Sequence, residues 1–150
     1  MRRRWNTEIM KSLLILPFFT SSLFASEFEQ DASPTSYDVA QVTYVSASQQ
    51  DDGNWCFKTS VRHNDEGWEH YADGWQVLDL NGNQLADRLL THPHVNEQPF
   101  TRRLCDIQIP EGTVKVVVRA KCNKHSYGDK TIVVDLNKVE GDGYQVRRLN

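Results

Sequence analysis

The feature that most constrains the fold is the regular division of residues 39–136 into short segments rich in β-branched and aromatic residues. Gly, Asn, Asp and Pro separate these segments at intervals of about ten residues, which is typical of an all-β sandwich. An apolar stripe with the period of an amphipathic helix does not occur over any useful length. The expected strands are 39–48, 54–63, 74–80, 83–92, 98–109, 113–122 and 130–136.

Local patterns agree with this division. In the segment 54–63, alternate residues share one face, and the face expected to point inward carries Trp55, Phe57, Thr59 and Val61. Asn81-Gly82 predicts a β-hairpin through a type I′ turn, in which both central residues need a positive φ. Pro110-Glu111-Gly112 predicts a second tight connection.

Seven strands in this order predict an immunoglobulin-like or fibronectin-III-like β-sandwich. In that topology the strands 54–63 and 98–109 are antiparallel neighbours, so Cys56 lies near Cys105 and a disulfide between them is the favoured pairing. A Cys56–Cys122 bridge, which needs an inward-facing Cys56, and the absence of a bridge are the alternatives. Cys122 shares the inward parity of Val114, so we expect a buried small residue rather than a reactive thiol.

Residues 1–25 have the pattern of a cleavable signal peptide, with a basic start, an apolar run over 13–19 and the small residue Ala25 at the expected cleavage position. The run is interrupted by Pro17 and is shorter than the roughly 20 residues of a spanning helix, so no stable membrane span is expected after cleavage. No cysteine follows the run closely, which argues against a lipid anchor. A periplasmic or secreted protein is expected, in a compartment that permits disulfides.

The predicted organisation has three parts after the signal peptide: a flexible leader over 26–37, a β-sandwich domain over 38–138 and a C-terminal tail over 139–150 with no inferable role. Removing residues 1–25 takes four basic residues and Glu8 from totals of 17 and 20, which leaves 13 basic and 19 acidic residues and a net charge of −6. A nucleic-acid partner is disfavoured because binding a polyanion needs a basic surface.

All five histidines lie in loops or at strand ends: His63, His70, His92, His94 and His125. The three connections that carry them emerge at one end of the predicted sandwich. Zn or Cu binding is one hypothesis, because neutral imidazole is a good ligand for both ions. A polar network, in which each imidazole pairs with a carboxylate or a backbone carbonyl, is the favoured alternative.

The same end also suits a small ligand or a partner protein, whose candidate binding residues are His63, Asp65, Trp68, His70, Tyr71, Asp73, Glu97 and Arg102. The aromatic side chains among them could stack on a sugar or on a protein surface. An internal ion pair between Arg102 or Arg103 and the aspartates Asp65 and Asp73 needs no ligand and is preferred.

Two stretches carry a resemblance: Arg62 to Asp73, with the pattern RHxDxGWxHYAD, and His92 to Arg102, with the pattern HPHxxEQPFTR. They resemble a group of small exported bacterial proteins with no assigned activity, and the resemblance covers roughly 39–136. It implies an exported domain and singles out the histidine-bearing loops, without implying a reaction. The cysteines are not part of the shared pattern.

No sequence signature of an enzyme is present, neither a Gly-x-Ser-x-Gly elbow nor a phosphate-binding glycine loop nor a Cys/His catalytic pattern. The sequence therefore favours a non-enzymatic exported domain whose histidine-rich end is a polar network or a binding site. A periplasmic metal-binding protein is the alternative.

Overall fold

A computed structural model of the chain describes residues 36–149. The predicted signal peptide over 1–25 and nearly all of the predicted leader over 26–37 lie outside the described residues. Within 36–149 the regular structure consists of ten β-strands, which confirms the all-β prediction. No helix in that range is long and apolar enough to cross a membrane.

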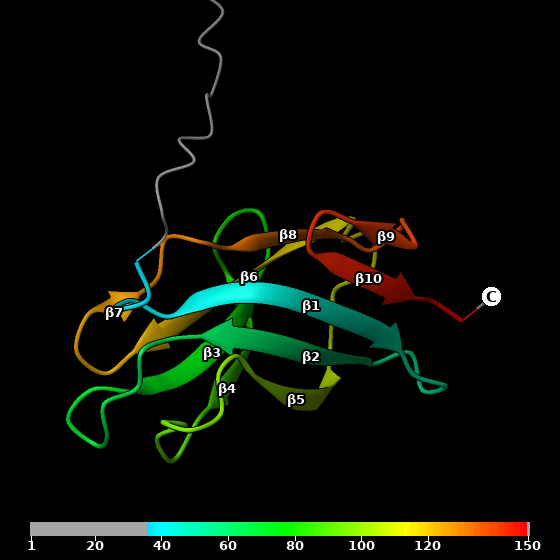
Figure 1. Cartoon of the computed structure of the whole chain (residues 1–150). Helices are drawn as coiled ribbons and strands as arrows, with labels where there is room; N and C mark the ends of the chain where they lie inside the picture. Colours follow the sequence, from blue (N-terminus) through cyan, green and yellow to red (C-terminus); the bar gives the residue numbers. More distant parts are fainter. Residues whose placement is uncertain (1–35, 150) are drawn as a thin grey trace, which may run out of the picture. The chain divides into compact units, whose positions relative to one another are not determined.

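The strands form two sheets (Figure 1). The first has the order β5-β2-β1-β10-β9, with strands β5 (Phe100–Ile107), β2 (Trp55–Arg62), β1 (Gln41–Gln49), β10 (Tyr144–Arg147) and β9 (Glu140–Gly141). The second has the order β4-β3-β6-β7, and β8 also pairs with β6; its strands are β4 (Gln84–Leu89), β3 (Ala72–Leu78), β6 (Lys115–Cys122), β7 (Ser126–Tyr127) and β8 (Ile132–Asp135). All seven expected strands are present, and β2 and β5 are antiparallel neighbours as predicted.

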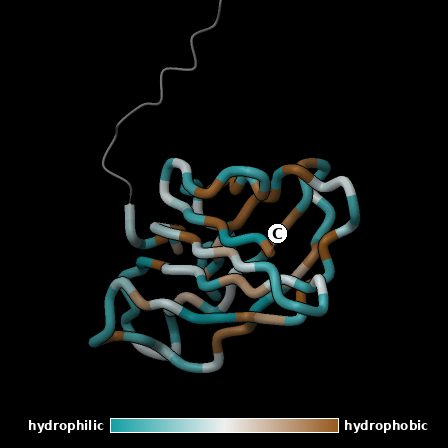
Figure 2. Tube along the Cα trace, turned by 90° about the vertical axis from the view of Figure 1, so that its right-hand side faces the viewer, coloured by the Kyte–Doolittle hydropathy of each residue, from teal (hydrophilic) through white to brown (hydrophobic). Residues whose placement is uncertain are grey.

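Both sheets contribute side chains to one hydrophobic core. The four residues of β2 expected to face inward are all buried, as are Trp75 and Val77 of β3 and Val116 and Val118 of β6. The resulting alternation of polar and apolar residues along the strands can be followed in Figure 2. Val114, expected on the same inward face, is instead 47% exposed because β6 begins only at Lys115.

The hairpin between β3 and β4 is present, but its turn differs from the predicted type I′ turn. Gly82 has a φ of 84°, whereas Asn81 does not have a positive φ. The Gly82 amide donates to the Asp79 carbonyl at 3.1 Å. The Asp79 carboxylate accepts from the amides of Asn81 and Asn83, both at 2.8 Å. These bonds stabilise a turn that needs the left-handed conformation only at its glycine.

The domain extends beyond the boundary predicted at residue 138. In the segment expected to be a tail, β10 pairs in parallel with β1, with Val45 opposite Tyr144 and Ala47 opposite Val146. Tyr144 and Val146 are buried and belong to the core. The signal was the alternation of apolar and polar residues over 144–147, which is too short to stand out by itself.

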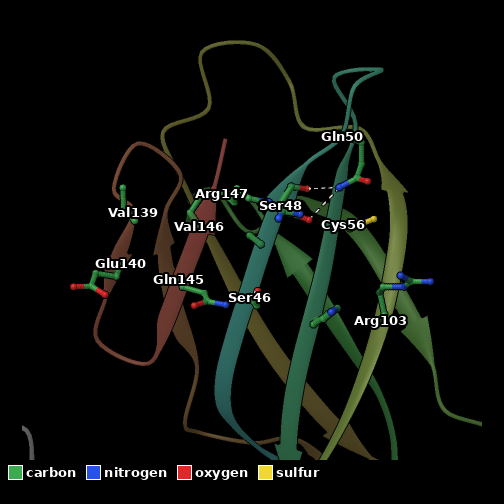
Figure 3. Close-up of a pocket in the computed structure, with 12 residues that line it drawn as sticks. Ser46, Ser48, Gln50, Cys56, Arg103, Val139, Glu140, Gln145, Val146 and Arg147 are labelled. Atoms are coloured by element: carbon green, nitrogen blue, oxygen red, sulfur yellow. Dashed lines mark hydrogen bonds between the residues drawn. The ribbon is translucent and has the colours of Figure 1, made fainter. Parts of the chain in front are cut away.

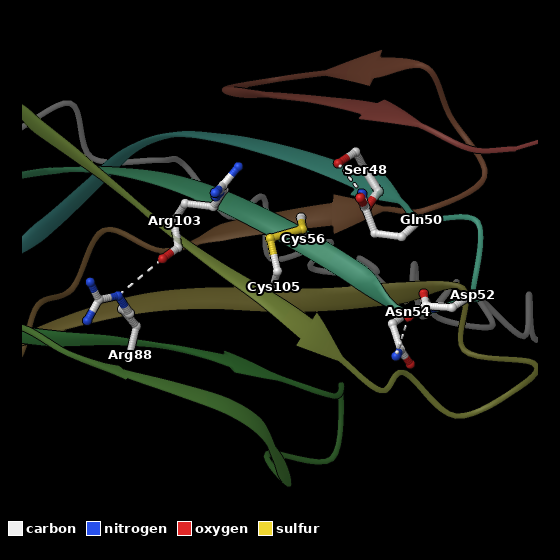
Figure 4. Close-up of a disulfide and its surroundings, with 8 residues drawn as sticks. All are labelled: Ser48, Gln50, Asp52, Asn54, Cys56, Arg88, Arg103 and Cys105. Carbon is white, nitrogen blue, oxygen red and sulfur yellow. Dashed lines mark hydrogen bonds between the residues drawn. A yellow bond between two sulfur atoms is a disulfide. The ribbon is translucent and has the colours of Figure 1, made fainter.

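A disulfide joins Cys56 of β2 to Cys105 of β5, the pairing favoured from the sequence (Figure 4). The disulfide lies on the outer side of the sheet, where Cys56 and Lys58 line a surface pocket. Cys56 is at the opposite end of β2 from His63. Cys122 is a free, buried thiol.

Replacing both bridged cysteines, as Cys56→Ser plus Cys105→Ser, is expected to lower the free energy of unfolding by about 2–4 kcal/mol, because the bridge restricts the unfolded chain. Urea unfolding of the double variant and of the reduced wild type measures this loss, and the two should agree. An unfolding midpoint equal to that of the oxidised wild type would contradict the expectation.

Candidate metal centre

Three separate segments meet at one end of the two sheets. The register of β1 and β2 sets Gln41 opposite Arg62, so the residues just before β1 lie beside His63. The register of β3 and β6 sets Ala72 opposite Cys122, so the end of β6 lies beside the loop that carries His70. Regular strand pairing therefore brings the side chains of this candidate site together.

The inner ring nitrogens of two histidines point at a common space. His63 Nε2 and His70 Nε2 are 3.1 Å apart, and each is 3.1 Å from the carbonyl oxygen of Asp38. Cys122 Sγ is 3.9 Å from His70 Nε2 and 3.9 Å from the same oxygen. One ligand atom each of His63, His70 and Cys122 lies within 4.8 Å of the others, and all three residues are buried.

The outer ring nitrogens of the same histidines contact carboxylates. His63 Nδ1 donates to Asp65 Oδ1 at 2.6 Å, and His70 Nδ1 donates to Glu66 Oε2 at 3.0 Å. A carboxylate can only accept, so each ring carries a proton on Nδ1, and a neutral ring then presents its Nε2 lone pair to the common space. Metal-binding histidines are oriented by such carboxylates in many proteins.

The buried carboxylate of Asp65 accepts hydrogen bonds from two further residues besides His63. Its Oδ1 also accepts from the Ala72 amide at 3.0 Å, and its Oδ2 accepts from the His94 amide at 2.6 Å. Burial alone raises the pKa of Asp65, but the hydrogen bonds from His63, His94 and Ala72 outweigh it and hold the pKa below its ordinary value. Asp65 is therefore a buried carboxylate that stays ionised.

His125 lies at the exposed edge of the same space. Its ring is 4.8 Å from that of His70 between centroids, and its Nδ1 donates to the Asp38 carbonyl oxygen at 2.9 Å. Its backbone amide donates to Cys122 Sγ at 3.2 Å. His125 thus holds both the carbonyl oxygen and the sulfur in place.

The chain is similar to a protein of Halomicrobium mukohataei whose description is "Putative lipoprotein". The two are 46% identical over 79 residues, which are 53% of this chain and 38% of that protein. The chain therefore spans well under half the length of this relative. No model of a known protein family matches the chain, and no solved structure matches it.

His92 and His94 lie apart from the group formed by His63, His70 and Cys122, so the structure does not bring all five histidines of the metal hypothesis to one point. The His94 ring stacks on Phe100 with centroids 3.9 Å apart, and neither of its nitrogens has a hydrogen-bond partner. Burial, followed by the charge of Arg102, lowers the pKa of His94. His92 is exposed; its ring lies 4.5 Å from the His94 ring between centroids, and its Nδ1 donates to the Pro93 carbonyl at 3.1 Å.

The other residues proposed from the sequence lie around these two groups. Trp68 is 66% exposed and meets the Tyr71 ring edge to face at 5.8 Å between centroids. Asp73 Oδ1 is buried without a hydrogen-bond partner. Arg102 pairs with Glu97 at 2.9 and 3.2 Å rather than with either of the two expected aspartates, because Glu97 lies in the loop just before β5 and needs no burial of charge.

Sequence reasoning missed two parts of the site. Cys122 was correctly expected to be buried, but its burial was taken as a reason against a functional role. The usable signal was a cysteine at the end of a strand with His125 three residues later. The Asp38 carbonyl carries no side-chain signal at all, since any residue supplies a backbone oxygen.

A surface pocket of about 560 Å³ lies elsewhere, on the outer face of the first sheet near the disulfide (Figure 3). Its lining includes Lys58, Arg103, Arg147 and Glu140, so charges of both signs face it. None of its lining residues has a buried polar atom without a partner. The pocket offers space but no set of groups aimed at a ligand.

Proposed function

We propose that this protein is an exported β-sandwich domain that binds one transition-metal ion, Zn or Cu, through His63, His70 and Cys122. The observation that carries the proposal is the convergence of the two Nε2 atoms and the Asp38 carbonyl oxygen at 3.1 Å from one another, beside a buried sulfur. Imidazole and thiolate are the ligands that zinc and copper prefer.

The balance of hydrogen-bond donors and acceptors supports a cation at this position. With both Nδ1 protons donated to carboxylates, His63 Nε2, His70 Nε2 and the Asp38 oxygen are three acceptors with no donor among them. Three lone pairs at this separation repel one another unless a positive charge lies between them. A metal ion supplies that charge, and an extra proton on one ring is the alternative, which would make the group a polar network.

The separations also fit a metal shell. Ligands at about 2.0–2.1 Å for nitrogen and about 2.3 Å for sulfur around a tetrahedral zinc are roughly 3.3–3.6 Å apart. The distances between His63 Nε2 and His70 Nε2, 3.1 Å, and between His70 Nε2 and Cys122 Sγ, 3.9 Å, lie on either side of this range. The three ligand atoms all lie within 4.8 Å of one another, so binding one ion would require the sulfur and the ring nitrogens to draw closer together.

Three observations support the exported, immunoglobulin-like part of the proposal. The sheet orders β5-β2-β1 and β4-β3-β6-β8 correspond to those expected for that sandwich, with β9 and β10 added beside β1. The disulfide suits an oxidising compartment, either the periplasm or the exterior. The relative's description is that of a lipoprotein, although the first cysteine here, Cys56, is bonded to Cys105.

A zinc titration in competition with a chromophoric chelator tests the proposal on the untagged protein. The wild type should bind one equivalent, and His70→Ala should weaken binding by at least about 100-fold, because a ligand is lost rather than only its orientation. His92→Ala is the matched control and should bind as the wild type does, since His92 lies outside the site. Equal binding by His70→Ala and the wild type, or binding of neither zinc nor copper by the wild type, would overturn the proposal.

A further inference from the structure

Resting on that proposed function, we infer that the metal is copper. Its three strong ligands would be His63 Nε2, His70 Nε2 and Cys122 Sγ, and the Asp38 carbonyl oxygen would be a weak axial ligand. The centre would cycle between Cu(I) and Cu(II), and the domain would pass single electrons to and from a redox partner.

The ligand set separates copper from the other candidates. Structural zinc sites are usually closed by four side-chain ligands, and hard ions such as calcium and magnesium take oxygen ligands. Two imidazoles, one thiolate and a distant backbone oxygen are the set found in electron-transfer copper sites. Here the fourth atom near the group is the Asp38 oxygen, at 3.1 Å from each ring nitrogen and 3.9 Å from the sulfur.

His125 makes that oxygen a weak ligand. Its Nδ1–H donates to the Asp38 oxygen at 2.9 Å, so one lone pair of the carbonyl is already engaged. The same bond occupies Nδ1 of His125, so this nitrogen is not free to bind the metal. His125 therefore supports a three-coordinate plane with one long axial contact, instead of supplying a fourth strong ligand.

The sulfur is protected as a copper ligand requires. Cys122 is only 3% exposed. The two other cysteines of the chain are bonded to each other, so neither is available to form a disulfide with Cys122. The amide of His125 donates to Sγ at 3.2 Å. Hydrogen bonds to the cysteine sulfur are among the features that tune the potential of such copper sites.

The surroundings hold the ligands in one geometry for both oxidation states. His63 is fully buried and fixed by the buried Asp65, while His70 is fixed by Glu66 at the surface. His125 is exposed and lies between the ligand group and solvent, so an electron reaches the metal along this edge. In the redox step Cu(I) gives one electron to a one-electron acceptor and becomes Cu(II), and no ligand bond has to break.

Visible absorption tests the inference directly. The protein is loaded with one equivalent of Cu(I) without oxygen and then treated with one equivalent of hexacyanoferrate(III), which is reduced to hexacyanoferrate(II). We expect an intense thiolate-to-copper charge-transfer band that one electron equivalent of reductant removes and reoxidation restores. Cys122→Ser should lose the band, whereas Asp38→Asn should keep it, because only the backbone of Asp38 is used.

X-ray absorption at the copper edge of the wild type gives a measurement that does not depend on a variant folding, and a short copper–sulfur bond is expected. Copper bound without the band or without that bond would overturn the inference. Stoichiometric zinc binding lost in His70→Ala would then still support the proposed function. Failure to bind either metal would overturn both.

Discussion

Asp65→Ala is expected to lower the free energy of unfolding by about 3–5 kcal/mol and to weaken metal binding by about 10–100-fold. The carboxylate accepts from His63 Nδ1 and from the amides of Ala72 and His94, and alanine would leave these three donors buried without partners. The His63 ring would also lose the contact that sets its tautomer. Urea unfolding of the metal-free protein and zinc competition measure the two effects separately.

Glu66→Ala is the matched control for this prediction. Glu66 makes the equivalent contact to His70, but its side chain is 66% exposed, so its loss should reduce metal affinity with little change in stability. If Asp65→Ala is as stable as Glu66→Ala, the buried carboxylate does not hold this end of the domain together.

The pH dependence of stability follows from the lowered pKa of Asp65. A carboxyl group whose pKa is lower in the folded state stabilises the fold above its ordinary pKa of 3.8 and loses that contribution as the pH falls below it. The difference in stability between the wild type and Asp65→Ala should therefore shrink in acid below this value. A difference that stayed constant from neutral pH to below the folded pKa would contradict the assignment.

Gly128→Ala is expected to destabilise the protein by about 3 kcal/mol or more, the upper end of the usual cost of overpacking. A Cβ at this position would lie 1.8 Å from the carbonyl oxygen of Ala40, and this backbone atom cannot move without the segment that leads into β1. Gly128 is itself held to β6 by its bond to the Ala120 carbonyl at 3.0 Å. The segment before β1 would therefore be pushed away from the site.

The same displacement should affect the metal centre, because Asp38 lies two residues before Ala40. Gln41 fastens this segment by accepting from the Lys130 amide at 2.7 Å, so a shift would also break a buried contact. Unfolding curves and the zinc competition assay report the two consequences, with the exposed Thr131→Ala as control. Wild-type behaviour of Gly128→Ala in both assays would show that the close approach is not required.

Sequence patterns predicted the parts of this structure that depend on local periodicity and on strand order. Alternation along β2 placed its core residues correctly, and the order of the strands placed Cys56 beside Cys105. The positions of the loops predicted that the histidines lie at one end of the sandwich, because the connections between strands can lie only at its two ends.

The remaining features depend on specific contacts that no local periodicity of the sequence predicts. The parallel pairing of β10 with β1 joins residues about a hundred positions apart in the chain. The stacking of His94 on Phe100 and the pairing of Arg102 with Glu97 separate two groups that spacing alone had combined. The placement of the Cys122 sulfur beside His70 depends on the strand register between β3 and β6.

Elemental analysis of the untagged protein, purified without chelators from cells supplied with zinc and copper, measures whether the site holds a metal. We expect about one metal ion per chain in the wild type and a small fraction of that in the double variant His63→Ala plus His70→Ala, with His92→Ala unchanged. A wild type that is free of metal and does not take up zinc or copper in vitro would contradict the proposed function. The inner nitrogens of His63 and His70 would then be held together by a proton.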